Sequence, residues 1–188
     1  MFRLFILAAL GATLWFGFDS IHVRAGIFAV QGSSGVPAWM VLCYFAGFLG
    51  VGLFFRALEA RSTIQPVTVS RLAIEILAFL TLLAAHYVWF SSELVYAAIT
   101  GSYLAGRLLL RREPGDFATV AFVALLDLGV ELTLIRLGRF SYAHSHWLPV
   151  PLWLSPMWGG LGLSVRRFFR FAARPLGIGV PAPKAAVG

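Results

Sequence analysis

The sequence predicts an all-α polytopic membrane protein with six transmembrane helices and both chain termini in the cytoplasm. Of its 188 residues, 60% are hydrophobic and only 12% are charged, which is too little charge to cover the surface of a soluble domain. Several apolar runs approach or exceed the roughly 18–20 residues that a helix needs to cross a bilayer. The charged residues lie at the ends of these runs. The net charge of +7 therefore forms no basic face, and we expect no nucleic-acid partner.

The helices can be placed in order from these runs and from the residues that interrupt them. The first covers residues 4–18 and can be extended toward residue 29; it resembles a signal peptide but lacks a small-residue cleavage site directly after it. The second begins at Pro37, where a missing N–H costs least, and ends near residue 58. Further helices are expected over residues 69–90, 93–110, 117–137 and 151–169. We assign residues 1–172 to one transmembrane domain, and the Pro- and Gly-containing residues 173–188 to a disordered tail.

The distribution of Lys and Arg supports the count of six. With six spans, all but three of the 15 Lys and Arg residues fall on the side that holds both termini. Cytoplasmic loops carry an excess of these residues, so both termini are predicted to be cytoplasmic. Only Arg24, Arg136 and Arg139 fall on the opposite side.

Small residues recur at a spacing that lets membrane helices approach closely. The fourth helix has Ala97, Gly101 and Ala105 four residues apart, and the sixth has a glycine-rich run from Gly159 to Gly162. Close backbone contact is a main source of helix association in lipid. A small-residue face of this kind also allows homo-oligomerisation, as a dimer or a trimer.

Asp127 and Glu131 are the sharpest polar feature inside a predicted span. Four residues apart, they share one face of the fifth helix, and such carboxylates are costly unless they face a partner, water or a cavity. Hydrogen bonds to other helices or an ion pair with Arg107 or Arg136 would explain them structurally. A ligand cavity or acid–base catalysis would explain them functionally.

Other polar residues favour structural interpretations. Arg71 and Glu75 are four residues apart at the start of the third helix, which favours an interfacial pair. His86 is expected to bond to a neighbouring helix. His144 and His146 would point the same way in an extended segment, but zinc needs further ligands that the neighbourhood lacks, so we expect an interfacial loop and no metal. No cofactor motif is present.

A series of short motifs follows in order along the chain: Ser33-Ser34 before Val36-Pro37, then Gly138-Arg-Phe-Ser-Tyr142, Trp147-Leu-Pro149, the glycine run and Arg166-Arg167. Through these motifs, residues 30–170 resemble the Insig family. His86 and the short basic loop ending at Gly115 also match in position. Insig proteins are six-helix membrane proteins of the endoplasmic reticulum; the resemblance implies oxysterol binding among the helices, a Scap partner and no enzymatic activity.

The chain departs from the family where partner and sterol specificity lie. The family's Scap-engaging aspartate falls near Leu110, a pocket phenylalanine falls near Thr81, and pocket residues of the fourth helix fall near Ala97 and Gly106. A Scap-type partner is therefore not expected. The Ala-, Arg- and Leu-rich composition with one lysine is typical of a bacterial genome, which favours the plasma membrane over the endoplasmic reticulum.

These observations predict a non-enzymatic, Insig-like protein that binds an apolar lipid, diacylglycerol-like or sterol-like, in a cavity between its helices. The expected ligand contacts are Trp15, Tyr44, Phe79, Thr81, His86, Asp127 and Glu131. The alternative is a membrane-embedded lipid isomerase or hydratase that uses Asp127, Glu131 and His86 for proton transfer.

Overall fold

A computed structural model describes residues 2–60 and 67–173, and in this part of the chain it contains six helices and two short strands. The predicted tail, from residue 174 onward, lies outside the described residues. The helices and strands, in chain order, are α1 (Phe2–Arg24), β1 (Phe28–Val30), α2 (Ala38–Glu59), α3 (Val69–Trp89), α4 (Glu93–Leu110), α5 (Asp116–Arg136), β2 (Phe140–Tyr142) and α6 (Leu154–Ala173).

The predicted helices are present, with ends shifted by a few residues. The largest shift is in α1, which continues to Arg24 without a break. The strands were not predicted: β1 and β2 pair antiparallel, with Phe28 opposite Tyr142 and Val30 opposite Phe140. Three-residue strands are too short to show an alternating pattern, so the sequence gives little sign of them.

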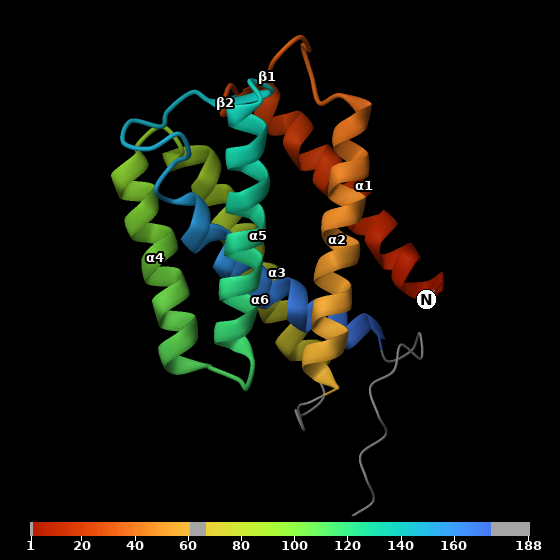
Figure 1. Cartoon of the computed structure of the whole chain (residues 1–188). Helices are drawn as coiled ribbons and strands as arrows, with labels where there is room; N and C mark the ends of the chain where they lie inside the picture. Colours follow the sequence, from red (N-terminus) through yellow and green to blue (C-terminus); the bar gives the residue numbers. More distant parts are fainter. Residues whose placement is uncertain (1, 61–66, 174–188) are drawn as a thin grey trace, which may run out of the picture.

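Gly138 directs the chain from α5 into β2. It has a positive φ of 65°, which a residue without Cβ adopts readily. The N–H of Arg139 then donates to the carbonyl of Leu134 at 2.9 Å, the bond that closes a glycine-ended helix. This turn places the β1–β2 pair over one end of the molecule, which we call the sheet end (Figure 1).

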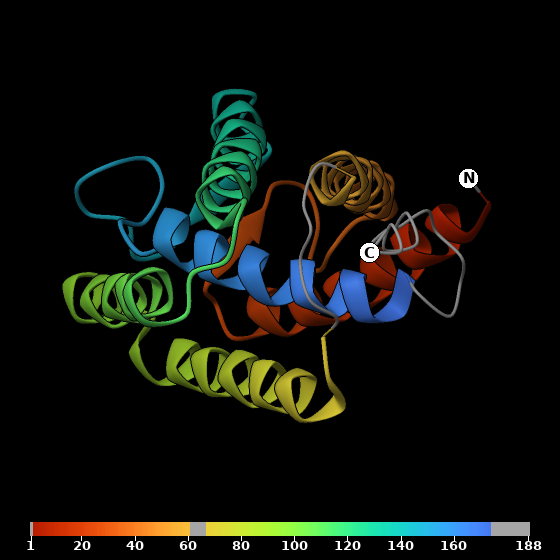
Figure 2. The ribbon, with the colours of Figure 1, turned by 90° about the horizontal axis from the view of Figure 1, so that it is seen from below.

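Helix α6 runs through the middle of the molecule, with α3 and α4 on one side and α5 and α2 on the other (Figure 2). Two of its glycines make this possible: a Cβ at Gly160 would lie 2.7 Å from the ring of Tyr103, and one at Gly162 would lie 3.0 Å from Val123. The close approach predicted for the α6 glycines is confirmed. Around Gly101 and Gly106 of α4, by contrast, a Cβ would meet nothing within 4 Å.

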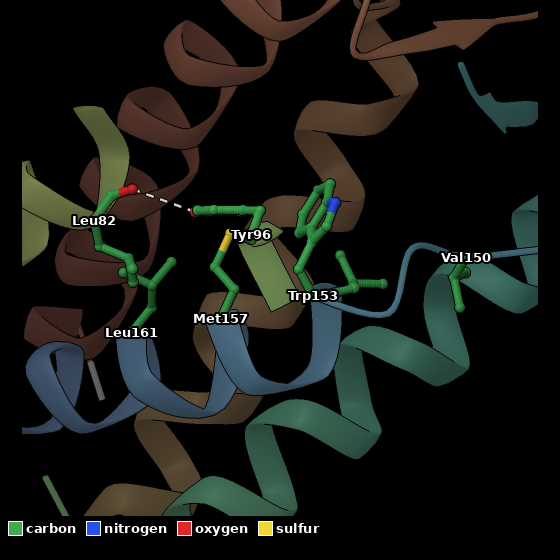
Figure 3. Close-up of a cluster of buried hydrophobic side chains, with 7 residues drawn as sticks. Leu82, Tyr96, Val150, Trp153, Met157 and Leu161 are labelled. Carbon is green, nitrogen blue, oxygen red and sulfur yellow. Dashed lines mark hydrogen bonds between the residues drawn. The ribbon is translucent and has the colours of Figure 1, made fainter. Parts of the chain in front are cut away.

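A buried hydrophobic cluster joins α6 to α3 and α4 (Figure 3). Trp153, Met157 and Leu161 project from α6 and its N-terminal approach toward Leu82 and Tyr96. The hydroxyl of Tyr96 donates to the carbonyl of Leu82 at 3.2 Å, so the phenol is buried without losing its hydrogen bond.

Four helices, α1, α2, α3 and α5, are long and apolar enough to cross a membrane. The chain is therefore an all-α membrane protein apart from its small β pair. Among the described residues, α4 and α6 do not reach the same hydropathy. Three arginines of α6 explain the difference for that helix.

Those arginines form a buried charge network at the end of the molecule opposite the sheet, which we call the arginine end. Arg166 is 0% exposed and pairs with Glu59 of α2 at 2.7 Å and with Asp116 of α5 at 2.9 Å. Arg167 pairs with Asp116 at 3.0 Å and with Glu75 of α3 at 3.3 Å. From the sequence these arginines are expected to be charges at the end of an apolar run, whereas the structure buries them among carboxylates from three other helices.

The predicted pair of Arg71 with Glu75 is wrong. Arg71 instead contacts Glu113, in the α4–α5 loop, at 2.5 Å. Glu75 pairs with Arg107 of α4 at 2.8 Å as well as with Arg167. Both carboxylates turn inward toward the α6 arginines, because a buried cation is tolerated only when it is paired.

Replacing Gly162 by alanine is expected to destabilise the fold by about 1–3 kcal/mol, because the new methyl group overlaps the side chain of Val123. Gly101→Ala is the matched control: the space is open there, so the variant is expected to be neutral or slightly stabilising. Thermal unfolding in detergent measures both. Equal melting temperatures for the two variants would contradict the close packing of α6.

Stability is expected to depend on the charge of Glu113. Burial opposes ionisation of this loop residue, but Arg167, Arg170 and Arg71 together lower its pKa below the usual value. A lowered pKa in the folded state stabilises the protein above the pKa of a free glutamate, and this stabilisation disappears as the pH falls through the lowered value.

Glu113→Gln is therefore expected to melt below the wild type at pH 7, with the gap narrowing as the pH falls from about 5 toward 3. Arg111→Gln, which removes an exposed charge from the same loop, serves as the control. A gap that does not change with pH would show that the Glu113 carboxylate contributes nothing through its charge.

Candidate functional site

A cavity lies between α1, α2, α5 and α6 and is closed at the sheet end by β1 and β2. It measures about 1060 Å³, including the part that is continuous with the outside. We call it the central cavity.

The walls of the central cavity are mostly apolar. They are formed by Gly47, Phe48 and Val51 of α2, and by Val123, Leu126 and Val130 of α5. Trp15 of α1 and Trp158 of α6, with ring centroids 4.6 Å apart, form another part of the wall.

Polar side chains gather where the cavity approaches the strands. The hydroxyl of Tyr44 donates to Asp19 at 2.5 Å, and the other carboxylate oxygen of Asp19 lies 3.2 Å from Nδ1 of His22. On the facing wall the hydroxyl of Tyr142 donates to Glu131. All five side chains line the cavity, and we call this part its polar end.

Tyr142 is held as a hydrogen-bond donor. Burial, and then the negative charges of Glu131 and Asp127, raise the pKa of the Tyr142 phenol well above its usual value. The phenol therefore keeps its proton and donates a hydrogen bond to Glu131. Strand β2 places it there, because its pairing with β1 fixes Tyr142 opposite Phe28.

His86 is also at the cavity, but without the predicted bond to a neighbouring helix. It is 2% exposed and packs among rings, with His22 at 4.9 Å, Trp153 at 4.8 Å and Tyr96 at 5.1 Å between centroids. Neither ring nitrogen has a hydrogen-bond partner among the described residues. The prediction of a hydrogen bond is wrong; aromatic packing takes its place.

Five of the seven predicted contact residues line the central cavity: Trp15, Tyr44, His86, Asp127 and Glu131. The other two do not. Phe79 packs against the buried cluster of Figure 3, with its ring 5.9 Å from that of Phe18. Thr81 lies on the exposed side of α3 and donates to the carbonyl of Leu77, one turn earlier.

The structure also separates the explanations for Asp127 and Glu131. Arg107 pairs with Glu75, so it is not the partner of either carboxylate. Both carboxylates line the cavity, and Oδ2 of Asp127 has no hydrogen-bond partner in the described part of the chain. All three residues of the enzyme alternative line the cavity, but His86 makes no hydrogen bond to either carboxylate among the described residues.

The two histidines of the α5–α6 connection do not line the central cavity. The ring of His144 packs against Phe90, with centroids 5.5 Å apart, and the backbone N–H of His146 donates to Glu93 at 2.9 Å. The described residues contain no group of His, Cys, Asp and Glu able to hold a metal ion. Glu93 also accepts from the N–H of Leu152 at 2.8 Å, which holds this connection against α4.

Sequence reasoning did not single out Asp19 and His22 as site residues. They fall just beyond the expected range of the first helix, residues 4–18, where the direction of their side chains could not be deduced. The continuous α1 puts them one turn apart on the face that also carries Trp15. The sequence signal for this face is spacing: Asp19 follows Trp15 by four residues and precedes His22 by three, as residues on one side of a helix do.

Solved structures share this arrangement. A mycobacterial Insig homolog, MvINS from Mycobacterium vanbaalenii, matches with a TM-score of 0.73 and 19% identity over 98% of this chain and 97% of the other. A cross-linked trimer of an MvINS variant matches with a TM-score of 0.71 and 20% identity over the same shares. This chain has a bacterial Insig-like fold.

The Insig resemblance predicted from the sequence is thus confirmed for the fold. No family model and no curated protein matches the chain. At 19–20% identity, the likeness to MvINS is one of architecture. What the central cavity of this Insig-like protein holds has to be argued from its own residues.

Cys43, the only cysteine of the chain, is exposed and lines the central cavity one turn before Gly47. N-ethylmaleimide is expected to modify it, giving a single adduct in intact-mass spectra. Gly47→Leu should slow the reaction several-fold, because a Cβ at Gly47 meets only open space and a larger side chain would fill it.

Gly129→Leu provides the matched control, since Gly129 lies on the exposed side of α5 with equally open space around it. It is expected to react at the rate of the wild type. Equal rates for both leucine variants would mean that Cys43 is reached from outside and not through the cavity.

Proposed function

We propose that this protein binds an apolar lipid, diacylglycerol-like or sterol-like, in the central cavity and acts as a non-enzymatic lipid sensor. The observation that carries the proposal is the amphipathic character of the cavity: apolar walls from α2, α5 and α6 lead to a polar end formed by Asp19, Tyr44, Glu131 and Tyr142. A lipid with a small polar headgroup likewise has a long apolar part that ends in a polar group.

The walls suit the tails of such a lipid. Aromatic side chains from α1, α2 and α6 offer large apolar area at fixed positions, and Gly47 leaves room beside them. Moving apolar area out of water contributes about 25 cal/mol per Å² to the free energy of binding. A membrane lipid that enters the cavity, however, comes from contact with other lipids and not from water. Selectivity must then come from the polar end, where headgroup contacts differ from those in the bilayer.

We propose that all six helices lie in the membrane, with the arginine end in the cytoplasm. Most arginines belong to that end, which agrees with the positive-inside rule. Although α6 is less apolar than the other helices, its arginines are enclosed by α2, α3 and α5 and do not meet lipid. The proposed location is the bacterial plasma membrane.

The protein is also proposed to form a homo-oligomer. One solved neighbour is a cross-linked MvINS trimer. In this chain two glycines of α4 are not used for packing within the described fold, because a Cβ at Gly101 or Gly106 would touch nothing within 4 Å. A second copy packing against α4 would use this open face.

Lipid that co-purifies with the protein tests the proposal. Native mass spectrometry of gently purified wild type is expected to show one reproducible lipid per chain. Gly47→Leu should lose at least nine-tenths of it by filling the cavity, whereas Gly129→Leu should retain it. Only bulk lipid in all three proteins, or the same lipid retained by Gly47→Leu, would contradict binding in the central cavity.

A further inference from the structure

Carboxylates from two helices lie at the polar end of the central cavity or one helical turn from it, and the described lining contains no lysine or arginine. Asp19 belongs to α1, and Asp127 and Glu131 belong to α5; all three line the cavity. The arginines of the α6 network lie at the opposite end, where they are already paired.

The hydrogen bonds within the polar end leave particular atoms free to meet a ligand. The hydroxyls of Tyr44 and Tyr142 are committed to Asp19 and Glu131. Oδ2 of Asp127 has no hydrogen-bond partner among the described residues, although it is shielded from solvent. An unpaired buried acceptor is unfavourable, and a bound donor would satisfy it.

His86 points to a ligand independently of the carboxylates. It lines the cavity, is 2% exposed, and both of its ring nitrogens lack a partner in the described chain. Nε2 of His22 and Nε1 of Trp153 are also unpartnered there. These groups are suited to a neutral acceptor such as an ester carbonyl, but none of them supplies the permanent positive charge that an anionic headgroup needs.

We propose that the polar end selects lipids whose headgroup donates a hydrogen bond and carries no negative charge, with Asp127 as its acceptor. The headgroup is an alcohol or an ammonium group. A phosphate or carboxylate would be placed beside carboxylates without a cation to balance it, and a fully esterified headgroup would leave Asp127 unpaired. This inference rests on the proposed lipid binding and adds the chemical class of the ligand.

Four single-chain lipids with the same C18 hydrocarbon chain test the selection: oleyl alcohol, oleylamine, methyl oleate and oleyl phosphate. Each is titrated into delipidated wild-type protein in a non-ionic detergent, and occupancy is measured by protection of Cys43 from N-ethylmaleimide. The alcohol, the amine or both are expected to bind at least tenfold more tightly than the ester and the phosphate. Comparing alcohol with amine shows which donor is preferred.

Variants at Asp127 identify the acceptor. Asp127→Leu should reduce the preference for the donor lipids over methyl oleate to less than threefold. Asp127→Asn keeps an acceptor oxygen but removes the charge, so it should keep that preference and weaken the discrimination against oleyl phosphate. Gly129→Leu is the control and should behave as the wild type. If Asp127→Leu does not fold, the wild-type series still decides the headgroup claim.

The outcomes separate this inference from the proposed function. Equal protection by all four lipids, or strongest protection by the phosphate, overturns the headgroup selection while lipid binding stands. No protection by any of them, together with no co-purified lipid, overturns lipid binding itself. An unchanged preference in a folded Asp127→Leu variant overturns the role of Asp127 as the acceptor.

Discussion

The burial of Arg166 and Arg167 is the constraint on which the rest of the structure depends. A buried arginine is tolerated only with good partners, and here those partners come from α2, α3 and α5. Pairing with all of them requires α6 to run through the middle of the bundle. The α6 glycines permit it, because Tyr103 and Val123 lie where larger side chains would project. Charge fixes the position of α6, and the absence of Cβ atoms makes that position accessible.

The two ends of the molecule are therefore held together differently. At the arginine end the helices converge on paired charges. Elsewhere α2 packs along α1 while α5 packs along α6, and the central cavity lies between these two pairs. The β1–β2 pair and the connection held by Glu93 cover the sheet end. The cavity thus lies away from the charge network, between helices of which α2, α5 and α6 are joined through Arg166 at the opposite end.

Helix positions and the fold family could be predicted from the sequence, because apolar runs and an ordered set of short motifs span the chain. Five of the cavity residues could be named as well, among them Asp127 and Glu131: a carboxyl pair at helical spacing inside a span has few explanations. The partners of the charges could not be predicted. Arg71 and Glu75 have ideal spacing for a mutual pair, yet each finds a better partner on another element, and only the packed structure shows this. The hydrogen bond expected of His86 was wrong for the same reason, since surrounding rings replaced it.

The arginines of α6 also bear on how the protein is made. A single arginine near the centre of an isolated helix costs about 2.5–3.5 kcal/mol on insertion scales, so α6 alone is a poor substrate for lateral release into lipid. It is synthesised last of the six, when Glu59, Glu75 and Asp116 have already been delivered by earlier helices. With α6 in the membrane as proposed, its entry would be a step of tertiary assembly, driven by acidic groups already present in the nascent bundle. The order of synthesis and ionic pairing would then act together, so that the least apolar helix is inserted when its counter-charges are present.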